Sequence, residues 1–217
     1  MRKHPILFCG AMVRAILAGR KTQTRRVIKN VGYVCGHENE EVWSKQEQEI
    51  KCPYGQPGDC LWVKESCWID RQPISALGCL RAFFSDSDEV RLQNGEQHGH
   101  SPAGPLPADY MKLNPSLKLW TGRFMPRWAS RLTLDIVQVH VERLQEIQEA
   151  DAIHEGLTVQ VRELGALDQF KSTWDALNAK RGFGWDANPW VWVIEFSPVG
   201  EGNAKVVQAP LAEKATA

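Results

Sequence analysis

The chain has 217 residues, 43% of them hydrophobic, and its 26 Lys and Arg are balanced by 26 Asp and Glu. A chain of this length can bury a core as one domain with embellishments. The zero net charge argues against a protein that binds polyanions over its whole surface, so any contact with nucleic acid must be local.

The charge is unevenly distributed along the chain. Residues 1–37 carry eight Lys or Arg and no Asp or Glu, whereas residues 38–49 carry five Glu. The N-terminal region is therefore expected to be the electropositive pole of the molecule. No charged leader precedes an apolar run, and no segment approaches the length of a membrane span, so we expect a cytoplasmic protein without a membrane partner.

The six cysteines do not form a recognisable framework. Cys35, His37, Cys52 and Cys60 lack the paired Cys-x-x-Cys units that make a zinc site convincing. Without a secretion signal the thiols are expected to be reduced. We therefore expect ordinary buried or half-buried cysteines, no metal and no cofactor.

The first elements in the chain are a short strand at Ile6-Leu7-Phe8 and a helix. Met12, Val13, Ile16 and Leu17 recur at helical spacing. Gly19 can adopt the left-handed conformation that ends a helix, and so turn the chain away from the helix axis.

A motif rich in cations follows this helix directly. Gly19-Arg20-Lys21-Thr22-Gln23-Thr24-Arg25-Arg26 places one glycine, two threonine hydroxyls and four cations in eight positions. Such a loop suits a phosphate, a carbonyl oxygen or the edge of a nucleobase, and it can equally be a solvated basic turn. The spacing would let Lys21 and Thr24 be presented together.

The middle of the chain contains one clear strand and one long unclear segment. The turn signal Tyr54–Asp59 leads into a strand at Cys60–Glu65. Residues 69–123 are rich in Pro, Gly and Ser, with strand-like patches only at 80–84 and 89–92, and His98-Gly99-His100 is expected in a solvated loop. This segment indicates an insertion or an extended hairpin with long loops, not an independent domain.

The last third of the chain is more regular. Alternating apolar residues from Leu132 to Val141 predict a long strand with a bulge between Ile136 and Val137. Helices are predicted at 144–157 and 162–179, then an aromatic loop and a strand at 190–196. Residues 198–217 are expected to be a disordered tail. Strands dominate this core, which predicts an α+β fold built on a small β-barrel.

Several motifs in this order resemble the ASCH domain, a member of the PUA-like superfamily, and its longer phage and prophage-type members. They are Gly19-x-Lys21-x-x-Thr24-x-Arg26, Pro57-Gly58-Asp59-x-Leu61-Trp62-Val63, the long strand, the helix 149–157 and Val191-Trp192-Val193-Ile194-Glu195-Phe196. The likeness spans about residues 5–197 as a single domain, with 69–123 as an insertion. It implies a small mixed β-barrel with flanking helices and a cleft for RNA or a nucleoside.

The resemblance also implies an activity. Small bacterial members are metal-free amidohydrolases that remove the acyl group from N4-acetylcytidine and related N4-acylcytosines with a lysine, a threonine and a glutamate. The motif assigns the first two to Lys21 and Thr24. Glu155 matches the glutamate best, although spacing alone does not separate it from the other acidic residues of its segment, which are Glu146, Glu149 and Asp151.

These three residues allow a coherent mechanism. A threonine hydroxyl attacks only after a base removes its proton, and a lysine can be that base only if burial or neighbouring cations lower its pKa. Arg20, Arg25 and Arg26 are the candidate neighbours. Thr24 would attack the amide carbonyl, or a water would, and Glu155 would protonate the leaving amine.

Further residues are candidates for substrate binding. Arg26 would orient the substrate or stabilise an oxyanion, and Gly19 would be the hinge of the motif. Glu65 follows a strand that could line the barrel mouth, although a surface carboxylate paired with a cation is as good an interpretation. Trp68 and Trp185 lie beside loops and could flank a base.

Two other functions are also compatible with the sequence. One is an RNA-binding module without catalysis, whose affinity would fall with salt. The other is a ribonuclease, an activity that the family resemblance also allows. The sequence does not define the oligomeric state.

Overall fold

The computed structural model describes residues 1–35, 41–44, 49–70, 80–84, 88–93, 96–102, 117–157 and 165–199. The strands are β1 (Lys3–Leu7), β2 (Gln23–Val27), β3 (Val31–Cys35), β4 (Glu41–Ser44), β5 (Cys60–Lys64), β6 (Cys67–Asp70), β7 (Leu80–Phe83), β8 (Asp88–Gln93), β9 (Glu96–Pro102), β10 (Leu117–Trp120), β11 (Thr133–Arg143) and β12 (Trp190–Pro198). The α-helices are α1 (Gly10–Leu17), α3 (Glu149–His154) and α4 (Ala166–Asn178). Short 3-10 turns are η1 (Gly122–Phe124), η2 (Arg127–Ala129), η3 (Leu144–Glu146), η4 (Ala179–Arg181) and η5 (Trp185–Ala187).

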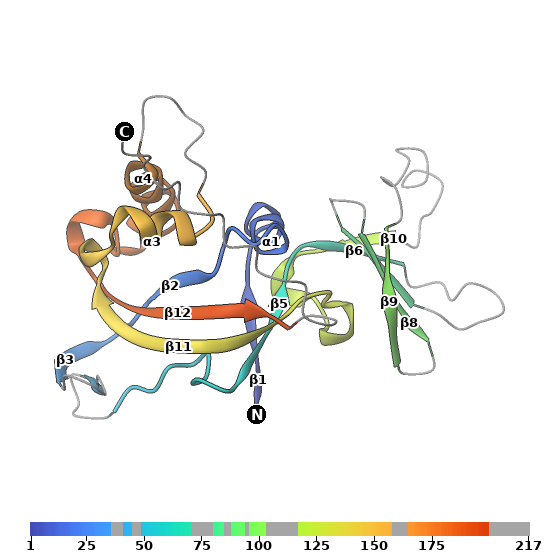
Figure 1. The fold of residues 1–217 in the computed structure, drawn as a ribbon, viewed down its shortest axis with the longest axis horizontal. Coiled ribbons are helices and arrows are strands. Elements are labelled where there is room, and N and C mark those ends of the chain that lie inside the picture. Colours follow the sequence, from blue (N-terminus) through green and yellow to red (C-terminus); the bar gives the residue numbers. More distant parts are fainter. Residues whose placement is uncertain are drawn as a thin grey trace, which may run out of the picture.

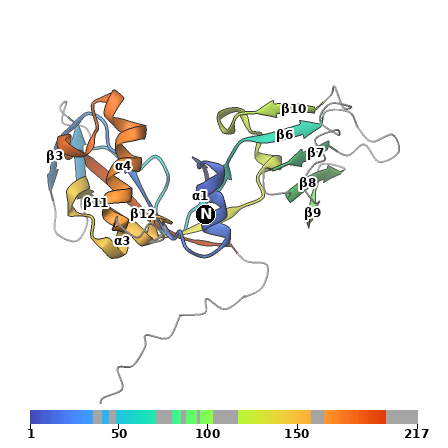
Figure 2. The same cartoon turned by 90° about the horizontal axis from the view of Figure 1, so that it is seen from above.

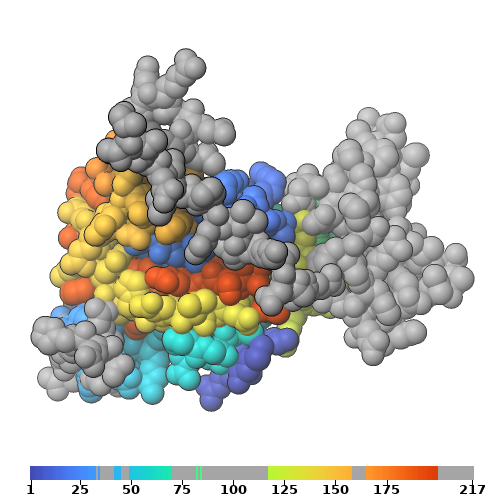
Figure 3. Space-filling view, viewed as in Figure 1, coloured from blue at the N-terminus to red at the C-terminus, as the bar shows by residue number. Residues whose placement is uncertain are grey.

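A five-stranded mixed sheet of order β1-β5-β11-β12-β2 is the centre of the molecule (Figure 1). β1 pairs parallel to β5, and the other pairs are antiparallel. In the space-filling view β11 and β12 form bands across one face, between the helices on one side and β5 and β1 on the other (Figure 3). β1 and β2 are the two edges of this sheet, so the strand order of the described residues is open.

The apolar run of β12 is explained by burial on both faces. Trp192, Ile194 and Phe196 pack in the main core with residues of β1, α1 and β5. Val191 and Val193 face the other way, into a cluster with α3 and α4. A strand covered on both faces loses the polar alternation of a half-exposed strand. On β11 the register shifts between Ile136 and Gln138, which confirms the predicted bulge.

Helices α3 and α4 cover one end of the large sheet, and α1 lies between them and the second sheet (Figure 2). The predicted helix 144–157 is divided into η3 and α3. Gly156 ends this region with a φ of 91°. In the part of the chain that is described, no helix is long and apolar enough to cross a membrane.

A second five-stranded antiparallel sheet of order β10-β6-β7-β8-β9 lies beside the first (Figure 1). It has a small apolar cluster of its own, which includes Cys67, Ile69 and Met125. Strands β7 to β10 lie within the predicted insertion, and β6 begins two residues before it. The prediction of a solvated loop at His98-Gly99-His100 is wrong, because these residues lie in β9.

The prediction of an α+β fold is confirmed at this coarse level. The predicted barrel is not closed among the described residues, because β1 and β2 do not pair with each other. The predicted tail begins too early, since β12 continues to Pro198. The rest of that tail, from residue 200, lies outside the described residues.

Candidate functional site

The cationic motif is half turn and half strand. Gly19 has a φ of 70° and follows α1, so the predicted glycine end of this helix is confirmed. From Gln23 onward, however, the motif is the edge strand β2 and not a loop. Side chains alternate along a strand, so Thr24 and Arg26 lie on the face of β2 opposite to Gln23 and Arg25.

Strand β2 also presents backbone groups to its open side. The Ile28 N–H donates to Trp190 O at 2.9 Å, and Phe196 N–H donates to Thr22 O at 2.8 Å. Because antiparallel bonding alternates along a strand, the even-numbered residues of β2 bond to β12. The backbone N–H and C=O of Arg25 and Val27 therefore point away from β12.

Lys21 is buried and paired with Glu155. Its Nζ donates to Glu155 Oε2 at 2.6 Å, to Glu155 O at 2.8 Å and to Gln23 O at 2.9 Å. These three acceptors match the three protons of an ammonium group. Lys21 and Glu155 also form a backbone bridge between the motif and the end of α3.

The environment of Lys21 opposes its charge. Burial is the largest cause that lowers the pKa of Lys21 below its ordinary value of 10.5, and Arg26 and Arg25 lower the pKa further. Glu155 acts in the other direction, through its charge and its hydrogen bond, but does not fully compensate. Arg20, the third predicted neighbour, is not among the groups that shift this pKa.

Arg25 links Glu155 to two further carboxylates. Its Nε donates to Glu142 Oε1 at 2.6 Å, and its Nη1 and Nη2 lie 3.4 Å from Glu155 Oε1 and Asp151 Oδ2. The Arg25 side chain is 1% exposed. Lys21, Arg25 and these three carboxylates form what we call the ion cluster, with one more negative than positive charge.

Gly156 fixes the geometry of the ion cluster next to Glu155. A Cβ built at Gly156 would lie 2.9 Å from Lys21 Cβ and 3.0 Å from Ala15 Cβ, and the φ of 91° also favours glycine. Arg20 Nη1 donates to Gly156 O at 3.2 Å. The close approach of this loop to Lys21 therefore depends on a residue without a side chain.

Arg26 lies on the opposite face of β2. Its Nη2 donates to Leu7 O at 2.8 Å, and its guanidinium lies 5.1 Å from the centre of the Phe8 ring. Its Nε is buried, and no described residue accepts a hydrogen bond from it. Burial is the main cause that lowers the pKa of Arg26 from its ordinary value.

A cleft of about 800 Å³ opens along the free side of β2. Its volume is within the roughly 300–1,000 Å³ of small-molecule sites. Thr24, Arg25, Arg26 and Glu155 line it, whereas Lys21 lies behind its wall. The other described residues that line the cleft are Leu7, Phe8, Cys9, Met12, Val27, Lys29, Tyr54, Ser66, Thr121, Gly122, Arg123, Leu157, Phe170, Thr173, Trp174, Leu177, Asn178 and Arg181.

Three residues predicted to bind substrate lie elsewhere. Glu65 is 2% exposed and forms a fork with Arg131, at 2.8 Å to Nε and 3.0 Å to Nη2. Trp68 lies in β6 of the second sheet. Trp185 packs against Phe170 beside α4. Neither these three nor Gly19 is among the described residues that line the cleft, so their predicted contacts with substrate have no support.

The sequence reasoning missed several residues of the cleft. Tyr54 and Trp174, together with Phe8 and Phe170, are the aromatic residues of the described lining that could flank a base, instead of Trp68 and Trp185. Tyr54 lies in a turn signal and Trp174 in the predicted helix 162–179, so local patterns favour a structural role for both. Outside the cleft, the sequence names Asp151 only as an alternative to Glu155 and gives no sign of Glu142, because no local pattern shows that the two share Arg25.

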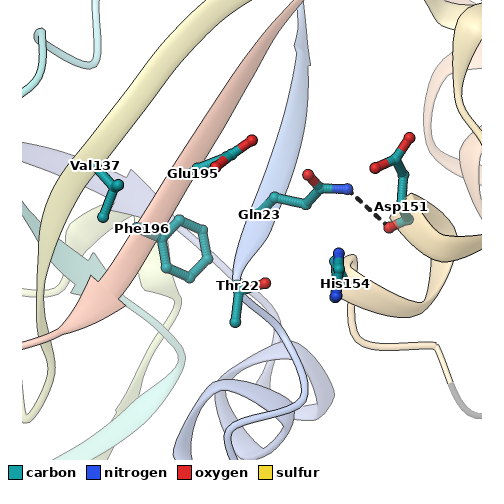
Figure 4. Close-up of a pocket in the computed structure, with 7 residues that line it drawn as sticks. All are labelled: Thr22, Gln23, Val137, Asp151, His154, Glu195 and Phe196. Carbon is teal, nitrogen blue, oxygen red and sulfur yellow. Dashed lines mark hydrogen bonds between the residues drawn. The ribbon is translucent and has the colours of Figure 1, made fainter. Parts of the chain in front are cut away.

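A second, smaller cavity lies on the other side of the ion cluster. Its volume is about 370 Å³, and it is lined by Thr22, Gln23, Val137, Asp151, His154, Glu195 and Phe196 (Figure 4). Gln23 Nε2 donates to Asp151 O at 2.9 Å across it. The cavity is separated from the cleft by β2, and it has none of the three predicted catalytic residues in its wall.

Cys52 and Cys67 give no alternative nucleophile, and the described residues give no metal site. Burial raises the pKa of Cys67 to about 12 and that of Cys52 to about 11, so both thiols are unreactive. Among the described residues no three His, Cys, Asp or Glu side chains are grouped so that they could hold a metal ion.

Comparisons with known proteins leave the family open. No family model matches the chain, and no curated protein matches it. The chain is similar to the crystal structure of protein EF3133 from Enterococcus faecalis V583, which is described with the family model DUF984. The TM-score is 0.41 at 10% sequence identity, over 92% of this chain and 81% of that chain. A likeness this distant defines neither the fold nor the function.

Proposed function

We propose that the protein is a metal-free amidohydrolase that removes the acyl group from N4-acetylcytidine or related N4-acylcytosine nucleosides or bases. We further propose that its large sheet is an open variant of the PUA-like barrel of ASCH domains. One observation carries the proposal: Glu155, which forms an ion pair with the buried Lys21, lines a cleft that Thr24 also lines.

The ion pair can supply both a base and an acid. Transfer of one proton from Lys21 Nζ to Glu155 Oε2, which are 2.6 Å apart, leaves a neutral amine and a neutral acid. The lowered pKa of Lys21 favours this transfer. The amine can accept the Thr24 proton and the acid can protonate the leaving amine, and these two steps restore the original pair.

The covalent route has two stages, acylation of Thr24 and hydrolysis of the acyl ester. Thr24 Oγ forms a bond to the acyl carbon, the bond from that carbon to N4 breaks, and N4 leaves with the proton from Glu155. Water then attacks the acyl ester and releases the carboxylic acid, while its proton returns to Thr24. In the direct route a water takes the place of Thr24, and Thr24 only orients it.

Negative charge develops on the acyl oxygen during the attack, and hydrogen-bond donors along the cleft must stabilise it. The backbone N–H groups of Arg25 and Val27 point away from β12, and both residues line the cleft. Fixed backbone donors of this kind stabilise an oxyanion without reorganisation. Arg26 lines the cleft from the other face of the same strand, where it can orient the rest of the substrate.

The reaction can be followed by ultraviolet absorbance when purified protein is incubated with N4-acetylcytidine. We expect release of cytidine, and a loss of roughly 10²–10⁴-fold in kcat/KM for Lys21→Ala and Thr24→Ala. Thr22→Ala is the matched control, because Thr22 lines the smaller cavity instead. If turnover is unchanged in both variants, the assignment of Lys21 and Thr24 to the catalytic site is wrong. Absence of cytidine at high enzyme concentration, with retention or cleavage of RNA, contradicts the activity.

A further inference from the structure

The cleft is lined by more positively than negatively charged side chains. Glu155 is the one carboxylate among the described residues that line it, and Lys21 and Arg25 already pair with this group. Three exposed cations lie at the rim, beyond the ion cluster, and we call them the rim cations. They are Lys29, Arg123 and Arg181.

The rim cations come from three separate parts of the chain. Lys29 follows β2, Arg123 lies in η1 and Arg181 ends η4. None of them has an ion pair with a carboxylate among the described residues. Since the whole chain has no net charge, this excess of positive charge is a local property of the cleft and would attract an anionic ligand.

Arg26 adds an independent observation. Its buried Nε has no acceptor among the described residues, although Nη2 bonds to Leu7 O. A guanidinium is suited to two parallel hydrogen bonds with a phosphate or carboxylate. The buried Nε therefore lacks a partner that an anionic oxygen in the cleft would supply.

From these charges we propose that the cleft takes a nucleotide, with the base at the ion cluster and a phosphate held by the rim cations and Arg26. Hydroxyl groups of Ser66, Thr121 and Thr173 line the same cleft and offer further donors. The identity of the reaction rests on the proposed function, but the phosphate contact does not. An N4-acylated cytidine monophosphate is then a better substrate than the nucleoside.

Calorimetry with cytidine and cytidine 5′-monophosphate tests the phosphate contact without any turnover. We expect the monophosphate to bind about tenfold or more tightly than cytidine at low salt, and the ratio to fall as salt rises. Lys29→Gln, Arg123→Gln and Arg181→Gln should each lower this ratio by about three- to tenfold. Equal affinity for the two ligands overturns the proposal.

Two nearby cations provide matched controls. Lys180 and Arg127 are exposed and close in sequence to Arg181 and Arg123, but they do not belong to the described lining of the cleft. Lys180→Gln and Arg127→Gln should leave the ratio within about twofold. If the control variants lower the affinity ratio as much as the rim variants do, the effect comes from the overall charge of the protein and not from a phosphate contact. That result would overturn the proposal.

Turnover separates this proposal from the proposed function. We expect kcat/KM for N4-acetylcytidine 5′-monophosphate to exceed that for the nucleoside by about tenfold. If neither is hydrolysed but the monophosphate still binds through the rim cations, the activity is wrong and the phosphate contact stands. If a short RNA binds far more tightly than the monophosphate through the same cations, the ligand is RNA and the nucleotide proposal is overturned.

Discussion

Two buried glutamates of this protein have similar partners and different surroundings. Glu155 Oε2 lies 2.6 Å from Lys21 Nζ, and Glu65 Oε1 lies 2.8 Å from Arg131 Nε. The side chains are 7% and 2% exposed. By burial and charge alone, either carboxylate could be read as catalytic.

The difference lies in what each glutamate faces. Glu155 lines the cleft and is shared by two cations. Glu65 is enclosed, with its own backbone N–H against Met125 Sδ and with Arg131 stacked 4.3 Å from the Phe84 ring. A buried ion pair therefore becomes a candidate site only when an open cavity gives it access to a ligand.

We expect the largest effect from a substitution that breaks the enclosed pair of Glu65 and Arg131. Arg131→Met leaves Glu65 buried without its bidentate partner, and breaking a buried pair in this way costs about 3–5 kcal/mol. We expect the free energy of unfolding, measured with urea, to fall by this amount. Turnover per folded molecule should stay within about twofold, because Arg131 does not line the cleft.

The pair at the cleft should instead respond to pH. The proposed reaction needs one proton shared by Lys21 and Glu155, so loss of that proton stops it. Because the pKa of Lys21 is lowered, we expect kcat/KM to fall in alkaline solution with a midpoint below 10.5. Activity that keeps rising through this range would contradict the shared proton.

The contribution of Lys21 to the free energy of unfolding should instead rise with pH over the same alkaline range. Between the lowered pKa of folded Lys21 and the ordinary value of 10.5, the unfolded chain binds more protons than the folded one. The contribution of Lys21 to stability therefore rises with pH in this window and is lost as pH falls through the lowered pKa. Lys21→Met should abolish this part of the dependence in urea titrations.

The smallest effects concern the aromatic residues. Tyr54→Leu should raise KM about tenfold, since stacking on a base is worth roughly 1–3 kcal/mol. Trp68→Leu and Trp185→Leu should change kcat/KM by less than about twofold, because neither residue is in the described lining of the cleft. If Trp185→Leu lowers kcat/KM tenfold while the folded fraction is unchanged, Trp185 belongs to the site after all.

The elements that the sequence predicted well have a local signature. The helix before Gly19, the strand after the Tyr54–Asp59 turn and the bulge in β11 all follow from periodicity or turn chemistry within a few residues. Strand β2 gave no such signal. Its Gln-Thr-Arg-Arg-Val sequence has no apolar alternation, because the ion cluster and the cleft take its polar side chains on both faces.

The site depends on contacts that no local pattern encodes. Lys21 and Glu155 are 134 residues apart, and their meeting requires α3 to pack beside the edge of β2. The resemblance selected Glu155 among several acidic residues of its segment. It could not show that Arg25 joins Glu155, Asp151 and Glu142, nor that Glu65 is enclosed by Arg131.

The most direct test compares Glu155→Gln with Glu65→Gln in the hydrolysis of N4-acetylcytidine, with each rate corrected for the folded fraction. Both substitutions remove one buried carboxylate charge at nearly constant volume. We predict that Glu155→Gln lowers kcat/KM by at least about 10²-fold, and that Glu65→Gln lowers the free energy of unfolding while kcat/KM stays within about twofold. Equal rates for the two variants would contradict the assignment of the cleft as the active site.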